Sequence, residues 1–234
     1  RIHREDEVEI STVYRAGLSG SGEYLGGDRS LASVWNVLGC YDAREPGAGP
    51  ALMRDFLQDK ITEAHHSRTP HFYYNTWGMQ RDEERKGADV RNVLTPERVL
   101  REIELAKRMN VELFVLDDGW QERFGDWTPD HKRYPSGLTW YVDALRSRGM
   151  IPGIWIAPLA TDPGTPLARA HPGWLIRDDQ ERPIVGRWDK HIFCFASGYR
   201  DEFIAACKRL IDAGIRYFKW DGIDKHLCSS PGHG

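Results

Sequence analysis

One unit, repeated three times along the chain, most constrains how it can fold: a helical segment, a residue that ends a helix, and a short apolar strand. In the first repeat, Thr95 can cap a helix that has Pro96 at its first position, and Asn110 suits a left-handed helix end. An apolar strand follows over residues 113–116 and ends at Asp117. The pattern predicts alternating helices and strands.

The other two repeats have a glycine at the end of the helix. The second has a helix that ends at Gly149 and a strand over residues 151–157. The third has a helix that ends at Gly214 and a strand over residues 215–220, and a further strand, 71–77, precedes all three repeats. The apolar face of the third helix is expected to consist of Phe203, Ile204, Cys207 and Ile211.

Short, almost continuously apolar strands that alternate with helices are typical of a parallel sheet. We predict an α/β fold, a (β/α)8 TIM-type barrel of which this chain carries about the first four β/α units. In such a barrel the loops after the strands form the active site. A doubly wound sheet would fit the alternation too, but no GxGxxG motif follows a strand, and the glycines between Gly20 and Gly26 have the wrong spacing.

The sequence before the repeats differs in character. Residues 1–49 are glycine-rich and irregular, which indicates the end of a separate N-terminal β-rich domain. Residues 50–66 are predicted to form an amphipathic connector helix, and residues 67–234 the first half of the barrel.

Composition narrows the class of partner and cofactor. The net charge of −3, without a block of like charges, argues against nucleic acid, and no apolar run approaches the roughly 20 residues that span a membrane. The histidines lack HxxxH or HxH spacing, so we expect neither a metal nor another cofactor. The cysteines are predicted to be free thiols: Cys40, Cys194, Cys207 and Cys228.

Residues with hydrogen-bonding or stacking side chains recur at the predicted strand ends: Trp77, Asp117, Asp118, Trp155, Lys219 and Asp221. If the strands are parallel neighbours, these side chains surround one pocket. Carboxylates accept hydrogen bonds from hydroxyl groups, an ammonium group donates to oxygen, and indole faces stack on apolar C–H groups. The combination describes a monosaccharide site.

Each of these residues also has a purely structural interpretation. The sequences Asp117-Asp118-Gly119 and Asp221-Gly222 could be simple turns, and Trp155 could belong to the core. Lys219 could be solvated, although its position two residues before Asp221 in a strand places both side chains on one face. The joint occurrence at four consecutive strand ends favours the functional interpretation.

Six motifs between about Pro70 and Asp224, "NTWG", "VLDDGWQ", "GDW", "MIPGIWIAP", "HPGWLIRD" and "KWDG", resemble the melibiase-type α-galactosidases of glycoside hydrolase family 36. The resemblance implies a β-sandwich, which residues 1–49 would end, followed by a catalytic (β/α)8 barrel. It implies a retaining hydrolase of terminal α-galactosides in which Asp221 is the nucleophile that forms a galactosyl-aspartate. Lys219 would then bind sugar hydroxyl groups.

By the same resemblance, Asp117 and Asp118 hold the O4 and O6 hydroxyl groups of galactose, and Trp77 and Trp155 form the walls of the pocket. The implied partner is an α-galactoside oligosaccharide. We also expect a homo-oligomer of the whole protein and a cytoplasmic location. The alternatives are a non-catalytic sugar-binding or structural half-barrel and an α-galactosyl transferase.

The sequence departs from the family pattern in several places. Ile223 stands where many members have asparagine, "WIAPL" lacks the carboxylate that many have, and the match around Arg187, a candidate substrate arginine, is poor. The general acid/base, an aspartate of a later strand, is not expected within this sequence, and Asp126 and Asp224 are weak substitutes.

An isolated half-barrel leaves its inner face open. Side chains expected on that face are Phe114, Leu116, Ile154 and Ile156. We therefore expect the 234 residues on their own to be inactive on unactivated α-galactosides, and to self-associate or fold poorly.

Overall fold

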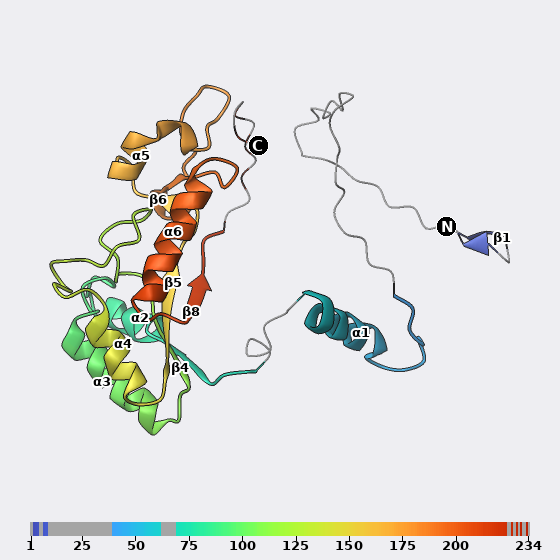
Figure 1. Ribbon diagram of the computed structural model, residues 1–234, viewed down its shortest axis with the longest axis horizontal. Coiled ribbons are helices and arrows are strands. Elements are labelled where there is room, and N and C mark those ends of the chain that lie inside the picture. The colour runs from blue at the N-terminus through green and yellow to red at the C-terminus, as the bar shows by residue number, and fades with distance from the viewer. Residues whose placement is uncertain are drawn as a thin grey trace. The chain divides into compact units, whose positions relative to one another are not determined.

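The computed structural model describes residues 2–4, 7–8, 39–61, 69–223, 226, 228, 230 and 233. The chain divides into two compact units, Arg1–Thr69 and Pro70–Gly234, and Figure 1 labels most of their helices and strands. No helix among the described residues is both long and apolar enough to cross a bilayer.

In the unit Arg1–Thr69, β1 (Ile2–Arg4) pairs antiparallel with β2 (Glu7–Val8). The helix α1 (Ala48–Phe56) continues as one π-helical segment, η1 (Leu57–Ile61), and buries none of its residues. A helix thus occupies the described part of the range predicted for the connector, beginning earlier than residue 50, and its role as a connector stays a prediction. Most of the predicted β-sandwich segment lies outside the described residues.

The unit Pro70–Gly234 contains a four-stranded sheet with the order β3-β4-β5-β8, and all its pairings are parallel. The strands are β3 (Tyr73–Asn75), β4 (Leu113–Leu116), β5 (Ile151–Ile156) and β8 (Tyr217–Trp220). The α-helices are α2 (Trp77–Arg85), α3 (Pro96–Arg108), α4 (Thr139–Arg146), α5 (Pro166–Ala170) and α6 (Tyr199–Asp212). The short segments β6 (Ala160–Thr161), η3 (Pro172–Trp174), η4 (Arg187–Asp189) and β7 (His191–Ile192) complete the unit.

The α/β class and the parallel sheet are thus confirmed, whereas the sheet described here is open, with β3 and β8 at its edges. The helix signals of the first repeat are confirmed as well. Thr95 Oγ1 accepts the N–H of Arg98, and Asn110 is left-handed with φ 57°. The strand predicted over 71–77 is shorter, because Trp77 begins the unpredicted helix α2.

The inner-face prediction was wrong. Phe114, Leu116, Ile154 and Ile156 are all fully buried. Phe114 stacks on Tyr74 and contacts Tyr141 of α4, so this set faces the helices. The side chains that alternate with it, including Val115, Trp155 and Lys219, occupy the other face.

That other face is closely packed over its centre. A Cβ on Gly153 would lie 2.7 Å from Val115 Cγ2 and 3.3 Å from the ring of Tyr217, so only glycine fits there. The Tyr73 and Tyr217 rings, from the two edge strands, have their centroids 6.2 Å apart. Tyr73 and Tyr217 therefore cover this face near the amino ends of the strands, and the polar residues of the face lie toward the carboxyl ends.

The predicted apolar face of α6 was also wrong in part. The helix buries Tyr199, Phe203, Ala206 and Leu210. Ile204 and Ile211 are instead 43% and 42% exposed. They line an apolar pocket of about 430 Å³ together with residues that include Cys207 and Trp220. β8 is accordingly an edge strand rather than a buried one, and its last residue, Trp220, is 54% exposed.

Candidate active site at the carboxyl ends of the strands

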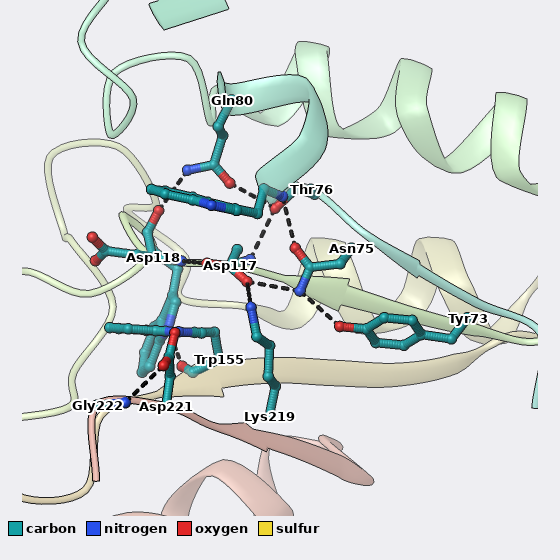
Figure 2. A network of polar contacts seen from close by, with 12 residues as sticks. Tyr73, Asn75, Thr76, Gln80, Asp117, Asp118, Trp155, Lys219, Asp221 and Gly222 are labelled. Atoms are coloured by element: carbon teal, nitrogen blue, oxygen red, sulfur yellow. Dashed lines mark hydrogen bonds and ion pairs between the residues drawn. The ribbon is translucent and has the colours of Figure 1, made fainter. Parts of the chain in front are cut away.

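Three adjacent parallel strands bring the polar candidates together. Asp117 directly follows β4, Trp155 belongs to β5 and pairs in register with Lys219 of β8, and Asp221 directly follows β8. Because successive strand residues alternate between faces, Lys219 and Asp221 project from the same face, as predicted. Figure 2 shows the side chains converging at this edge of the sheet.

The Asp117 carboxylate lies at the centre of the network and is almost fully buried. Its Oδ2 accepts hydrogen bonds from Lys219 Nζ and from Asn75 Nδ2, each at 2.7 Å, and its Oδ1 accepts the N–H of Asp118 at 2.9 Å. The ammonium group of Lys219 supplies the opposite charge, so a partly buried ion pair joins the end of β4 to β8 across β5.

Two buried side chains of the first β/α connection fix the turn after β4. The N–H of Asp117 donates to Thr76 Oγ1 at 2.9 Å, and the Thr76 hydroxyl donates to Gln80 Oε1 at 2.8 Å. Gln80 Nε2 donates in turn to the Asp118 carbonyl at 2.7 Å. These contacts preorganise the backbone that carries both aspartates.

The sequence reasoning missed Asn75, Thr76 and Gln80. A usable signal was the position of Asn75 at the end of a predicted strand, two residues after Tyr73 and hence on the same face. The side-chain oxygen Oδ1 of Asn75 also accepts the N–H of Trp77 at 2.7 Å, which orients the side-chain amide toward Asp117.

Asp118 is placed differently from its neighbour. Its carboxylate points away from Lys219 (Figure 2), and its Oδ1 accepts a hydrogen bond from Gln121 Nε2 at 2.6 Å. Burial raises the pKa of Asp118 above its ordinary value, although the hydrogen bond from Gln121 and the charge of Arg91 act to lower it. The two aspartates thus form a turn and also present their carboxylates in different directions.

Asp221 is half-buried and has two neighbouring donors. Its Oδ2 accepts Nε1–H of Trp155 at 3.1 Å, and its Oδ1 accepts the N–H of Gly222 at 2.7 Å. These bonds orient the carboxylate while each oxygen keeps further acceptor capacity.

Trp155 itself is only 2% exposed, as its interpretation as a core residue requires. Its ring contacts those of Phe124, Trp127 and Trp188 at centroid distances of 5.6, 6.2 and 6.0 Å. What it offers to the site is the N–H on its edge, and a role as a pocket wall stays a prediction.

Trp188 is an exposed indole next to the candidate nucleophile, and the sequence reasoning missed it. It is left-handed, with φ 55°, a conformation that is uncommon for an aromatic residue. A Cβ on Gly222 would lie 2.4 Å from the ring of Trp188, so the two residues are in close contact.

The remaining candidates have no hydrogen bond to Asp221 among the contacts of the described residues. Trp77 is half-buried at the start of α2, is joined to the network through Asn75, and has the guanidinium of Arg81 5.7 Å from its ring centroid. Asp126 has a pKa raised by burial, and the charges that act on it belong to residues such as Arg123 and Asp162. Arg187 lies in η4, and Asp224 lies outside the described residues.

The fold and the site define a parallel α/β protein with a carboxylate-lined site at the carboxyl ends of its strands. A family model described as Melibiase matches residues 94–232, more than half of the sequence, and the chain belongs to this family.

The curated relatives that the chain resembles are α-galactosidases. An α-galactosidase of Escherichia coli is 27% identical over 205 residues, which are 83% of this chain and 27% of that protein. Alpha-galactosidase 1 of Pediococcus pentosaceus is 29% identical over 133 residues, 53% of this chain and 18% of its own length. The chain therefore spans about a quarter or less of these relatives.

Solved structures agree with the fold. The α-galactosidase TtGalA of Thermus thermophilus, in complex with p-nitrophenyl α-D-galactopyranoside, matches with a TM-score of 0.54 and 26% identity over 65% of this chain and 30% of that one. The GH36 α-galactosidase AgaB of Geobacillus stearothermophilus matches with a TM-score of 0.59 over 73% of this chain and 24% of its own; at 24% identity it supports the fold alone.

Proposed function

We propose that the protein containing this chain is a retaining α-galactosidase, and that the four parallel strands belong to a (β/α)8 barrel. The observation that carries the proposal is the placement of Asp117, Lys219 and Asp221 on one face, at the carboxyl ends of neighbouring parallel strands. Membership of the Melibiase family, and relatives that are α-galactosidases, support it.

In this proposal Asp221 is the nucleophile. One of its oxygens attacks the anomeric carbon of the terminal galactose, the bond from that carbon to the leaving oxygen breaks, and a galactosyl-aspartate forms. The N–H groups of Trp155 and Gly222 hold the carboxylate in a defined orientation. Water then cleaves the ester and releases galactose with retained configuration.

Lys219 and Asp117 are proposed to bind sugar hydroxyl groups as a unit. Lys219 has three donors, one of which is used by Asp117 Oδ2, and the carboxylate can accept from a hydroxyl group. Asp118 is proposed to bind a second hydroxyl group from a different direction, because its carboxylate points away from Lys219. The exposed face of Trp188 offers a stacking surface beside Gly222.

Retention requires a second carboxyl group about 5 Å from the nucleophile, which protonates the leaving oxygen and then deprotonates water. Asp126 has a pKa raised by burial, and the charged groups that act on it, such as Arg123 and Asp162, do not include Asp221. We propose that another strand of the whole protein supplies the acid/base.

The test uses the native protein that contains these residues, with an aryl α-galactoside as substrate. Asp221→Ala is expected to abolish turnover, and added azide to restore part of it with an inverted galactosyl azide as product. Asp143→Ala, at an exposed position of α4, is the matched control and is expected to keep full activity. Wild-type turnover in Asp221→Ala would remove the assignment, and oligosaccharide products in the presence of a sugar acceptor would favour transfer over hydrolysis.

A further inference from the structure

A second group of reactive side chains lies outside the network around Asp117: Cys194, Cys228 and His233. Their ligand atoms, two thiol sulfurs and one imidazole nitrogen, all lie within 4.8 Å of one another. Cys194 comes two residues after β7, whereas Cys228 and His233 follow β8, so distant parts of the sequence meet here. The cysteines had been expected to be ordinary free thiols, and neither the proposed mechanism nor the main core uses this group.

The surroundings are apolar. Cys194 is buried with Ile176 and Ile192 in a small cluster separate from the main core, and Cys228 packs against this cluster. Two thiols and an imidazole in an apolar setting are the donor set that proteins use for zinc.

The hydrogen bonds of His233 fix which of its nitrogens can bind a metal. Its Nε2 lies against the backbone carbonyl of Gly173, and a carbonyl only accepts, so Nε2 carries the proton. In the neutral ring, Nδ1 then has a free lone pair, and it lies 2.9 Å from the sulfur of Cys228. A histidine whose second nitrogen donates to a backbone carbonyl is the usual arrangement at protein metal sites.

The segment η3, which contains Gly173, also positions a second ligand, Cys194. The N–H of Cys194 donates to the Trp174 carbonyl at 2.9 Å, next to the Gly173 carbonyl that orients His233. Adjacent residues of η3 therefore position ligands that come from two different parts of the chain.

We propose that Cys194, Cys228 and His233 bind a thiophilic divalent cation, Zn²⁺ in the first instance. In a tetrahedral zinc site the ligand atoms are about 3.5–3.8 Å apart, given bond lengths of about 2.3 Å to sulfur and about 2.0 Å to nitrogen. The 2.9 Å contact between Cys228 and His233 would have to open by at least about 0.6 Å, and any pair near the 4.8 Å limit would have to close by about 1 Å, to reach that geometry.

The charges balance as well. Binding converts two thiols into thiolates and releases two protons, so one Zn²⁺ with two thiolates and a neutral imidazole has no net charge, which suits a buried site. A water molecule completes the tetrahedron. The ion would tie Cys228 and His233, which follow Asp221 in the sequence, to η3 and the end of β7. The proposal does not depend on the α-galactosidase assignment.

The test is a cobalt titration of the reduced native protein that contains these residues, after removal of bound metal. Co²⁺ is expected to bind at one ion per chain, with a thiolate-to-cobalt charge-transfer band in the near ultraviolet that one equivalent of Zn²⁺ abolishes. Cys228→Ser and His233→Asn are expected to reduce the band strongly, and Cys194→Ser to do the same. Zn²⁺ is expected to raise the Tm of the wild type and not that of Cys228→Ser.

Cys207→Ser and Cys40→Ser are the matched controls, because these cysteines lie outside the group, and both variants are expected to keep the band. Far-ultraviolet circular dichroism of each variant separates loss of a ligand from loss of the fold, and His233→Asn serves if the buried Cys194→Ser variant unfolds. The proposal is overturned if the folded, reduced wild type shows no charge-transfer band. It is equally overturned if Cys207→Ser loses as much of the band as Cys228→Ser, or if Cys194 and Cys228 form a disulfide while the protein takes up no metal.

Discussion

The ion pair between Lys219 and Asp117 gives the sharpest test of the site's architecture. Replacing Lys219 by methionine keeps the length of the side chain but leaves the Asp117 carboxylate, whose side chain is 3% exposed, without its opposite charge. The carboxylate would retain its donors from Asn75 and from the N–H of Asp118. We expect the variant to fold with reduced stability.

The size of the expected stability loss depends on the hydrogen-bond donors that the Asp117 carboxylate keeps in the variant. A hydrogen bond to a charged group contributes about 1.5–3 kcal/mol, and removing one partner of a fully buried ion pair costs about 3–5 kcal/mol. Lys219 is 28% exposed, and Asp117 keeps two donors, so the smaller values apply. We expect Lys219→Met to lower the free energy of unfolding by about 2–3 kcal/mol, and the cycle with Asp117→Asn to give a coupling energy of about 1.5–2 kcal/mol.

The assay is urea unfolding followed by tryptophan fluorescence, for the wild type, both single variants and the double variant. Asp82 of α2 and Lys86, the residue after the end of α2, form the matched control, because they are the same residue types at the same 2.7 Å separation but on the surface. The control cycle, with Lys86→Met and Asp82→Asn, is expected to give a coupling near zero. Equal coupling energies in the two cycles would refute the argument that burial makes the Lys219 pair important.

Three further predictions concern the same site. Trp155→Phe, which removes the N–H donated to Asp221, is expected to lower kcat of the whole enzyme about 10- to 100-fold while the fold is kept; an unchanged kcat contradicts the positioning role. Trp188→Ala is expected to raise KM about 2- to 10-fold with kcat little changed, as loss of stacking predicts, and a loss confined to kcat contradicts it. Because burial raises the pKa of Asp118, the folded state binds the proton of this carboxyl group more tightly than the unfolded state does. The contribution of Asp118 to stability is therefore largest at low pH, and it falls as pH rises through the range between the unfolded and folded pKa values. The urea midpoint of the wild type minus that of Asp118→Asn is expected to fall as pH rises from acid to neutral, and a difference that does not change with pH contradicts the shift.

Local signals determined much of the fold from the sequence alone. Thr95, Pro96 and Asn110 act within a few residues of themselves, through capping and backbone preference, and they mark both ends of α3 in the structure. The strand over 113–116 was placed correctly for a similar reason, since a short apolar run between a helix end and two aspartates has few other conformations. The sequence also determines that Lys219 and Asp221 lie on the same face, because side chains alternate between the two faces along a strand.

Only the tertiary structure decided which face of each element is covered. The strands β4 and β5 are apolar on both faces, so the alternation that assigns a face is missing, and Phe114 and Ile154 lie under helices rather than on the inner face. Helix α6 likewise carries two apolar stripes side by side. The sheet covers the one that contains Leu210 and leaves Ile211 in an open pocket.

Long-range contacts decided the rest of the site. Asp117 and Lys219 are predicted site residues, but their direct pairing needs the order β4-β5-β8 and the register that places Lys219 beside Trp155. Trp188 and Cys194 had no motif to mark them, because their partners come from other parts of the chain. The sequence by itself determined which side chains could do chemistry, through residue type and strand phase; which of them meet was decided by packing, since contacts between residues far apart in sequence leave no local signal.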